Sequence, residues 1–188
     1  MKKIIVLVLC LVFMLSVSCA ESSIFETLAG MEWSFCSGVG GWSTDLQILA
    51  DGSFTGQYHD SEMGDCADEY PDGTVYICAF CGRMSLLEQI DAKTWKIRVD
   101  SLEKEAAEEM IDDSIRYMPS EPYGISEGDI MLLYAPGTPV TSFTEEMLFW
   151  THVMEQEDTP VELEDWFLCS DLNDSGFVGY PQAAVTLP

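Results

Sequence analysis

Two cysteines, Cys78 and Cys81, have the spacing of a redox or zinc motif. The segment that carries them, Thr74 to Cys81, is rich in β-branched and aromatic residues, which indicates a strand. Residues three apart on a strand point to opposite faces, so these two sulfurs are not expected to share a metal ion or a disulfide bond. We expect structural cysteines here. A thiol-dependent enzyme built on Cys78 or Cys81 stays open as the alternative.

A second pattern places oxygen ligands at alternate positions. Asp171, Asn173 and Ser175, followed by Gly176, match the start of an EF-hand calcium loop. The twelfth position is Gln182, which cannot supply the bidentate carboxylate of such a loop. Two interpretations stay open: a calcium site at these three residues, or a polar turn after a strand. No other cofactor is expected.

His59 is followed by two further residue types that take part in hydrolysis, Asp60 and Ser61. Neighbours on an extended chain cannot converge, so these three are not expected to form a Ser-His-Asp triad. The 33 acidic residues are too many for a glycosidase-like pair to be singled out. A hydrolytic cell-envelope enzyme that uses His59 belongs to the same alternative as the thiol enzyme.

The charge balance limits the possible partners. The chain has 8 Lys+Arg against 33 Asp+Glu, a net charge of −25 at pH 7. Nucleic acid is excluded, because its affinity depends on basic side chains at the phosphates. With 47% hydrophobic residues the chain is also too apolar for a disordered tail. An acidic surface favours cations or a basic protein surface, and we expect Lys96, Arg98 and the nearby Arg83 to form ion pairs across strands.

The N-terminus has the parts of a secretory signal peptide: two lysines, an apolar run from Ile4 to Leu15, and small residues up to Ala20. The apolar run is too short to span a bilayer, which takes about 20 residues. One interpretation is ordinary cleavage after Ala20, which gives a secreted protein that begins at Glu21. No linker or composition break follows, so a single domain is expected after the signal.

Residues 15–19, Leu-Ser-Val-Ser-Cys, resemble the lipobox of bacterial lipoproteins, although Ser16 stands where Leu is usual. The resemblance implies that residues 1–19 are the signal segment and that Cys19 is the lipid attachment site. Residues 20–188 would then be one extracytoplasmic domain held at the bacterial cell membrane through several acyl chains. The membrane, through this lipid, is thus one expected partner.

Alternation of apolar and polar residues between turn signals predicts a series of antiparallel strands. They cover Met31–Cys36, Thr44–Leu49, Phe54–Tyr58, Thr74–Cys81, Met84–Ile90, Trp95–Ser101, Ile115–Met118, Ile130–Tyr134 and Asp165–Ser170. In the pair that begins at Met84, a four-residue loop sets Ile90 opposite Trp95 and Leu86 opposite Val99.

Three segments have helical spacing. The first opens at Ser23 with a capping box and stops at Gly30. The second covers Leu102–Asp112, where strong helix formers predict a helical insertion. The third opens at Ser142 with another capping box and runs for about three turns to Met154. The fold class is therefore mainly β, an antiparallel up-and-down barrel or sandwich with peripheral helices.

The opening strands look like those of the lipocalin and avidin superfamily. Members commonly carry a Gly-x-Trp first strand and an Asp-Gly-x-x-Thr-Gly-x-Tyr hairpin. Here Gly30 to Trp33, with one residue more than that pattern, and Asp51 to Tyr58 (DGSFTGQY) stand in their place. The resemblance covers about the first thirty mature residues and implies a lipocalin-like barrel without biotin binding. The chain is also similar to uncharacterised exported bacterial domains.

In a closed barrel the first and last strands are neighbours, so a disulfide between Cys36 and Cys169 is expected. The function predicted is that of a non-enzymatic binding domain for a small apolar ligand or a protein partner. An internal cavity above about 300 Å³ would favour a small ligand. A filled core would favour a protein partner, and a cleft that joins His59 to a thiol would favour catalysis.

Mass spectrometry of the mature N-terminus tests the anchor. We expect an acylated Cys19 as the first residue, because the segment before it follows the lipobox pattern. An unmodified N-terminus at Glu21 would contradict lipid attachment and leave a secreted protein.

Overall fold

The computed structural model describes residues 24–153 and 161–182. The predicted signal segment, Cys19 included, lies outside these residues, as do Ser23 and Met154. Within the described residues no helix is both long and apolar enough to cross a membrane. The predicted first helix is present at residues 24–28 and turns at Gly30.

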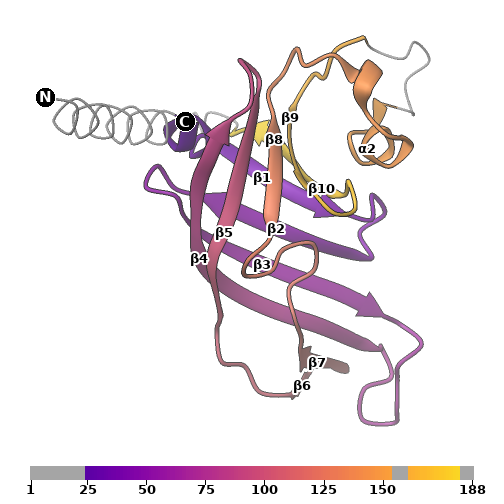
Figure 1. The fold of residues 1–188 in the computed structure, drawn as a ribbon. Coiled ribbons are helices and arrows are strands. Elements are labelled where there is room, and N and C mark those ends of the chain that lie inside the picture. The colour runs from indigo at the N-terminus through magenta and orange to yellow at the C-terminus, as the bar shows by residue number, and fades with distance from the viewer. Residues whose placement is uncertain (1–23, 154–160, 183–188) are drawn as a thin grey trace, which may run out of the picture.

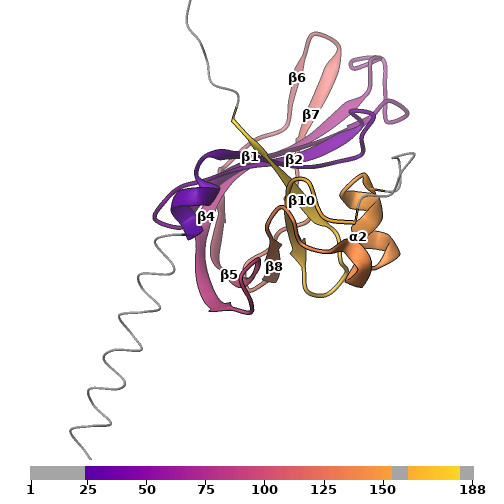
Figure 2. The ribbon, with the colours of Figure 1, turned by 90° about the horizontal axis from the view of Figure 1, so that it is seen from above.

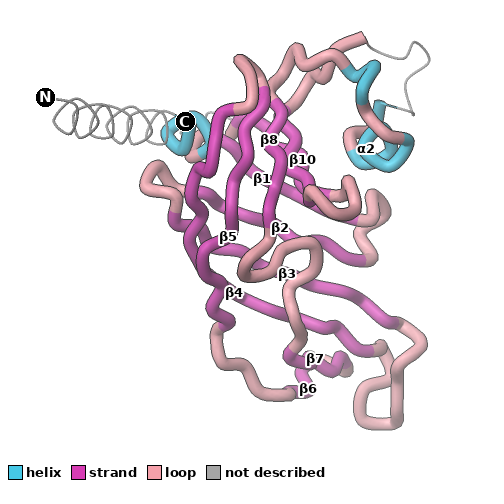
Figure 3. The backbone as a smooth tube through the Cα atoms, in the orientation of Figure 1, coloured by secondary structure: helices cyan, strands magenta, loops and turns pink. Residues whose placement is uncertain are grey.

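In the part of the chain that the structure describes, ten strands make up most of the regular structure (Figures 1 and 3). They are β1 (Met31–Cys36), β2 (Trp42–Ile48), β3 (Ser53–Glu62), β4 (Thr74–Gln89), β5 (Thr94–Lys104), β6 (Met110–Asp112), β7 (Ile115–Pro119), β8 (Ile130–Tyr134), β9 (Trp166–Ser170) and β10 (Gly176–Pro181). All except β6 and β7 form a closed ring of eight strands in which every neighbouring pair is antiparallel. The predicted fold class, mainly β with an up-and-down barrel, is confirmed.

The helical insertion predicted over Leu102–Asp112 is wrong. β5 continues to Lys104, and Met110–Asp112 forms β6, which pairs with β7. β7 in turn lies parallel to the start of β4. Local helix propensity is a weak preference. It gives way here because a long neighbour, β4, offers the segment's backbone a ladder of hydrogen bonds: residues 102–104 pair with residues 80–82.

β4 unites two strands that were predicted separately, because residues 82 and 83 continue the ladder between them. Its hairpin with β5 also differs in register. The expected pairings of Leu86 with Val99 and of Ile90 with Trp95 are wrong. The turn sets Gln89, not Ile90, opposite Trp95, and Leu87 is an extra residue in a β-bulge that shifts the register by one more residue. The observed pairs are Met84–Val99, Leu86–Ile97 and Gln89–Trp95. Of the apolar residues expected to share the inward face, Met84, Leu86, Ile97 and Val99 are buried, whereas Ile90 is 51% exposed.

Two segments close the ends of the barrel. At one end, the helix at residues 24–28 buries Phe25 and Leu28, and the Trp33 indole donates to the Leu28 carbonyl at 3.4 Å. At the other, the connection between β7 and β8 enters the barrel. Its Tyr123 ring stacks on Phe35 with centroids 5.5 Å apart, and its Ile125 is 1% exposed.

Aromatic rings fill the space between these ends so closely that small residues must face them. A Cβ atom at Gly82 would lie 2.5 Å from the Phe54 ring, and one at Gly179 would lie 2.7 Å from the Trp33 ring. Real Cβ atoms essentially never approach so closely. The interior is thus a packed core rather than a hollow, as the size of an eight-stranded barrel permits.

A short helical region covers the outside of β9 and β10. It contains a 3₁₀ turn, Val140–Ser142, and α2, Glu145–Trp150. Figure 2 shows α2 outside the ring of strands beside β10. A second apolar cluster fixes it there: Val140, Met147, Leu163, Phe167, Cys169 and Val178.

The predicted start and length of this helix are wrong. Thr144, not Ser142, caps α2, and its hydroxyl accepts a hydrogen bond from the Met147 amide at 3.2 Å. The helix has six residues and ends before Thr151 rather than running three turns. The chain then turns through a left-handed backbone at His152, where φ is +57°.

Substitution of Gly56 by Ala tests the packed interior. The added methyl would collide with the Phe80 ring and lie 2.8 Å from Leu46. We expect the free energy of unfolding in urea to fall by about 1–3 kcal/mol, the usual effect of overpacking a core. Gly41→Ala is the matched control, because its nearest new neighbour is 3.5 Å away, and it should change stability by about 0.5 kcal/mol or less. Equal stabilities for the two variants would indicate spare room inside the barrel.

Candidate functional site

Cys78 and Cys81 lie on opposite faces of β4, as predicted. Cys78 is opposite Tyr58 and faces the interior with 6% exposure, whereas Cys81 is opposite Thr55 and is exposed outside. Burial raises the pKa of the Cys78 thiol, an effect that Lys104 only partly opposes. A raised pKa lowers the fraction of nucleophilic thiolate. These two cysteines therefore have the geometry of structural residues.

The expected pairing of Cys36 with Cys169 is wrong in its premise. Asp165–Ser170 was expected to hold the last strand, but β10 follows and lies between β1 and β9. Two strand spacings amount to about 9.6 Å, beyond the Cα separation that a disulfide spans. Both cysteines are free, and burial raises the pKa of Cys169 to about 12.

His59 lies on β3 directly opposite Ser43 on β2. Its Nδ1 is 3.1 Å from the Ser43 Oγ, and that hydroxyl donates to Asp45 at 2.9 Å. A catalytic triad has the histidine between serine and acid, whereas here the serine is in the middle. The hairpin register would have indicated Ser43 from the sequence, since the Asp51-Gly52 turn sets which residues face each other. His59 and Cys78 point to opposite sides of the barrel wall, so they form no cleft.

The predicted calcium ligands form the turn between β9 and β10. Asp171 pairs with Lys96 at 3.2 Å, and the Asn173 side-chain oxygen accepts from the Ser175 hydroxyl at 2.9 Å. The polar-turn interpretation thus describes what these side chains do. Within residues 24–153 and 161–182, no group of three or more His, Cys, Asp or Glu side chains is placed to hold a metal ion. Calcium binding stays an expectation.

Every basic side chain outside the signal segment is held by an acceptor. Without Lys2 and Lys3, six of the 8 Lys+Arg remain. Five form ion pairs, which are Arg83–Asp51, Lys96–Asp171, Arg98–Asp100, Lys104–Glu121 and Arg116–Asp65. The Lys93 ammonium donates to the Gly137 carbonyl. The ion pairs expected for Arg83, Lys96 and Arg98 are therefore present, although their partners lie in turns or on the same strand rather than directly across.

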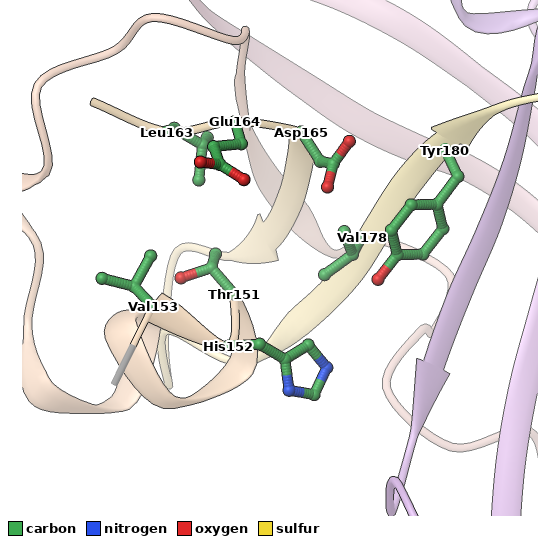
Figure 4. Close-up of a pocket in the computed structure, with 8 residues that line it drawn as sticks. All are labelled: Thr151, His152, Val153, Leu163, Glu164, Asp165, Val178 and Tyr180. Atoms are coloured by element: carbon green, nitrogen blue, oxygen red, sulfur yellow. The ribbon is translucent and has the colours of Figure 1, made fainter. Parts of the chain in front are cut away.

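A crevice opens where the residues after α2 meet β10 and the segment that leads into β9 (Figure 4). Its volume is about 110 Å³, and the residues that line it are Thr151, His152, Val153, Leu163, Glu164, Asp165, Val178 and Tyr180. A smaller hollow of about 90 Å³ adjoins it and shares His152, Val178 and Tyr180, with Cys36 and Trp150 on its far side. Three segments distant in the sequence thus meet at one place.

The crevice is negative and partly apolar. Burial, and then the charge of Glu164, raise the pKa of Asp165. Burial raises the pKa of Tyr180, and Asp165 and Cys36 add to this effect. Val153, Leu163 and Val178 form buried apolar walls. The sequence had indicated Cys36 in this region, as half of a disulfide.

Comparison with known proteins identifies no relative of this chain. No family model, no curated protein and no solved structure matches the chain. The barrel and the crevice therefore have to be interpreted from the chain's own packing and charge.

Timed alkylation with peptide mapping tests the thiol assignments. Cys66 and Cys81 are exposed and should react first, whereas Cys78 and Cys169 are buried and should react only after unfolding. At pH 8 a thiol with a pKa of about 12 has little thiolate, so Cys169 should react at least about 100-fold more slowly. Rapid labelling of Cys78, or a linked Cys36–Cys169 peptide under non-reducing conditions, would contradict these assignments.

Proposed function

We propose that the mature chain is an exported, lipid-anchored binding domain whose partner is a protein with a basic surface. The observation that carries the proposal is that the basic side chains of the domain are already paired within the chain, which leaves an excess of acidic side chains. All six Lys and Arg side chains outside the signal segment bind acceptors of the same chain, and their five ion pairs among the described residues involve five of the 33 acidic residues. The remaining charge attracts cationic partners from solution.

The packed interior favours a binding site on the outer surface and argues against a ligand held inside the barrel. Trp33, Phe35, Phe54 and Phe80 are each at most 2% exposed, and both ends of the barrel are covered. A site for a small molecule usually needs about 300 Å³ or more. The described interior is occupied by side chains instead, so the outer surface is the better candidate.

The anchor and the charge are compatible. A lipid on Cys19 would hold the domain beside the membrane, while anionic lipid headgroups would repel its negative surface. The domain would then project from the bilayer with its acidic surface accessible. An enzyme that uses Cys78, Cys81 or His59 receives no support from the geometry, because these side chains do not converge.

Peptide binding at varied ionic strength tests this proposal. We expect the processed protein to bind a twelve-residue peptide rich in lysine and not a peptide of the same length with glutamate at those positions. Calorimetry should show a loss of at least about tenfold in affinity between 50 and 500 mM salt. At the higher salt concentration, exposed charges more than a few Å apart are largely screened from each other. Equal binding of both peptides, or binding that salt leaves unchanged, would contradict a basic partner.

A further inference from the structure

We infer that the crevice beside α2 is a socket for one lysine or arginine side chain of the basic partner. The inference rests on the proposed function and adds a place and a chemical class to it. Long cationic side chains combine an apolar stem with a charged head. The crevice offers a matching combination, buried apolar walls next to a pair of carboxylates.

The walls come from three elements. Figure 4 shows Val178 and Tyr180 on β10, Glu164 and Asp165 on the segment that leads into β9, and the residues after α2 on the third side. Val153, Leu163 and Val178 are between 3% and 6% exposed, so their apolar surfaces are fixed by packing. The stem of a long side chain would contact these walls.

The volume of the crevice suits a single side chain. About 110 Å³ is well below the 300–1,000 Å³ of sites that enclose drug-sized ligands. A side chain of four to six heavy atoms beyond its Cβ, the size of lysine or arginine, fits such a space. A larger ligand would have to extend out of it, as the backbone of a partner would.

The charges of the crevice favour a cation. The five ion pairs of the lysine and arginine side chains use carboxylates other than Glu164 and Asp165. These two are adjacent, and burial, with a further contribution from the charge of Glu164, raises the pKa of Asp165. An ammonium or guanidinium group would relieve this repulsion. The Tyr180 ring at the rim, 41% exposed, can also attract the cation through its face.

The test uses the processed, isotope-labelled protein and four short peptides, Ac-Gly-Gly-X-Gly-Gly-NH₂. X is lysine, arginine, acetyl-lysine or norleucine, so that the last two keep the stem and lack the charge. We expect saturable shifts of the amide signals of Asp165, Val178 and Tyr180 with lysine or arginine. The neutral peptides should bind at least about tenfold more weakly. The tighter of the two cationic peptides identifies the side chain.

Matched variants distinguish binding at the crevice from attraction by the overall negative charge. Glu164→Gln with Asp165→Asn should weaken binding of the cationic peptide at least about tenfold. Glu103→Gln with Glu105→Gln removes the same charge away from the crevice and should change binding less than about twofold. Unchanged dispersion of the amide spectrum controls for folding.

The outcomes distinguish the two proposals. If both pairs of substitutions weaken binding equally, or if the neutral peptides shift the same signals as strongly, the socket is refuted. Should the short peptides not bind while the longer lysine-rich peptide does, the socket is again refuted and the basic partner stands. If no cationic peptide of either length binds, both proposals are refuted.

Discussion

The structure depends on the fit between inward aromatic rings and the glycines that face them. A barrel of eight strands encloses a space that side chains can just fill. Phe54 is accommodated because Gly82 has no Cβ, and Trp33 because Gly179 has none. With the helix at residues 24–28 and Ile125 at the two ends, little of the interior is left for a ligand. The packing that stabilises the fold thereby moves the candidate binding surface to the outside.

The same alternation that fills the interior leaves an outer face, and α2 covers only part of it. Met147 and Val140 pack with Phe167 and Val178 to form the second cluster. Because α2 has only six residues, the chain has to turn away soon after Trp150. It does so through a left-handed backbone at His152, a conformation that residues other than glycine seldom adopt. The crevice is the edge left uncovered by this short helix.

Strands were predictable where alternation is strong and neighbours are close in sequence. Met31–Cys36 and Ile130–Tyr134 were predicted with the bounds they have. β10 was missed because Gly-Phe-Val-Gly-Tyr-Pro contains two glycines and a proline, which are depleted in strands. Those glycines are required by tertiary contacts: Gly179 faces the Trp33 ring, and Gly176 approaches the backbone of β9. Local strand propensity does not reflect such tertiary contacts.

The candidate site was harder to predict than the strands, because its residues meet only after the barrel closes. Cys36, His152, Asp165 and Tyr180 lie on four separate segments, and no short motif links them. The missed β10 made this worse, since it provides the central wall of the crevice and separates Cys36 from Cys169. The aromatic and hairpin signals that predicted the barrel carry no information about the outer face of the last strand.

Long-range charge and the crevice would act at different stages of partner binding. The overall negative charge steers a basic partner toward the domain, and this steering weakens as salt shortens the distance over which charges act. It has little directional preference. A partly buried carboxylate such as Asp165 is screened less, and its contacts depend on the position of one side chain. Net charge would therefore set how fast a partner arrives, and the crevice would set which orientation of the partner is retained.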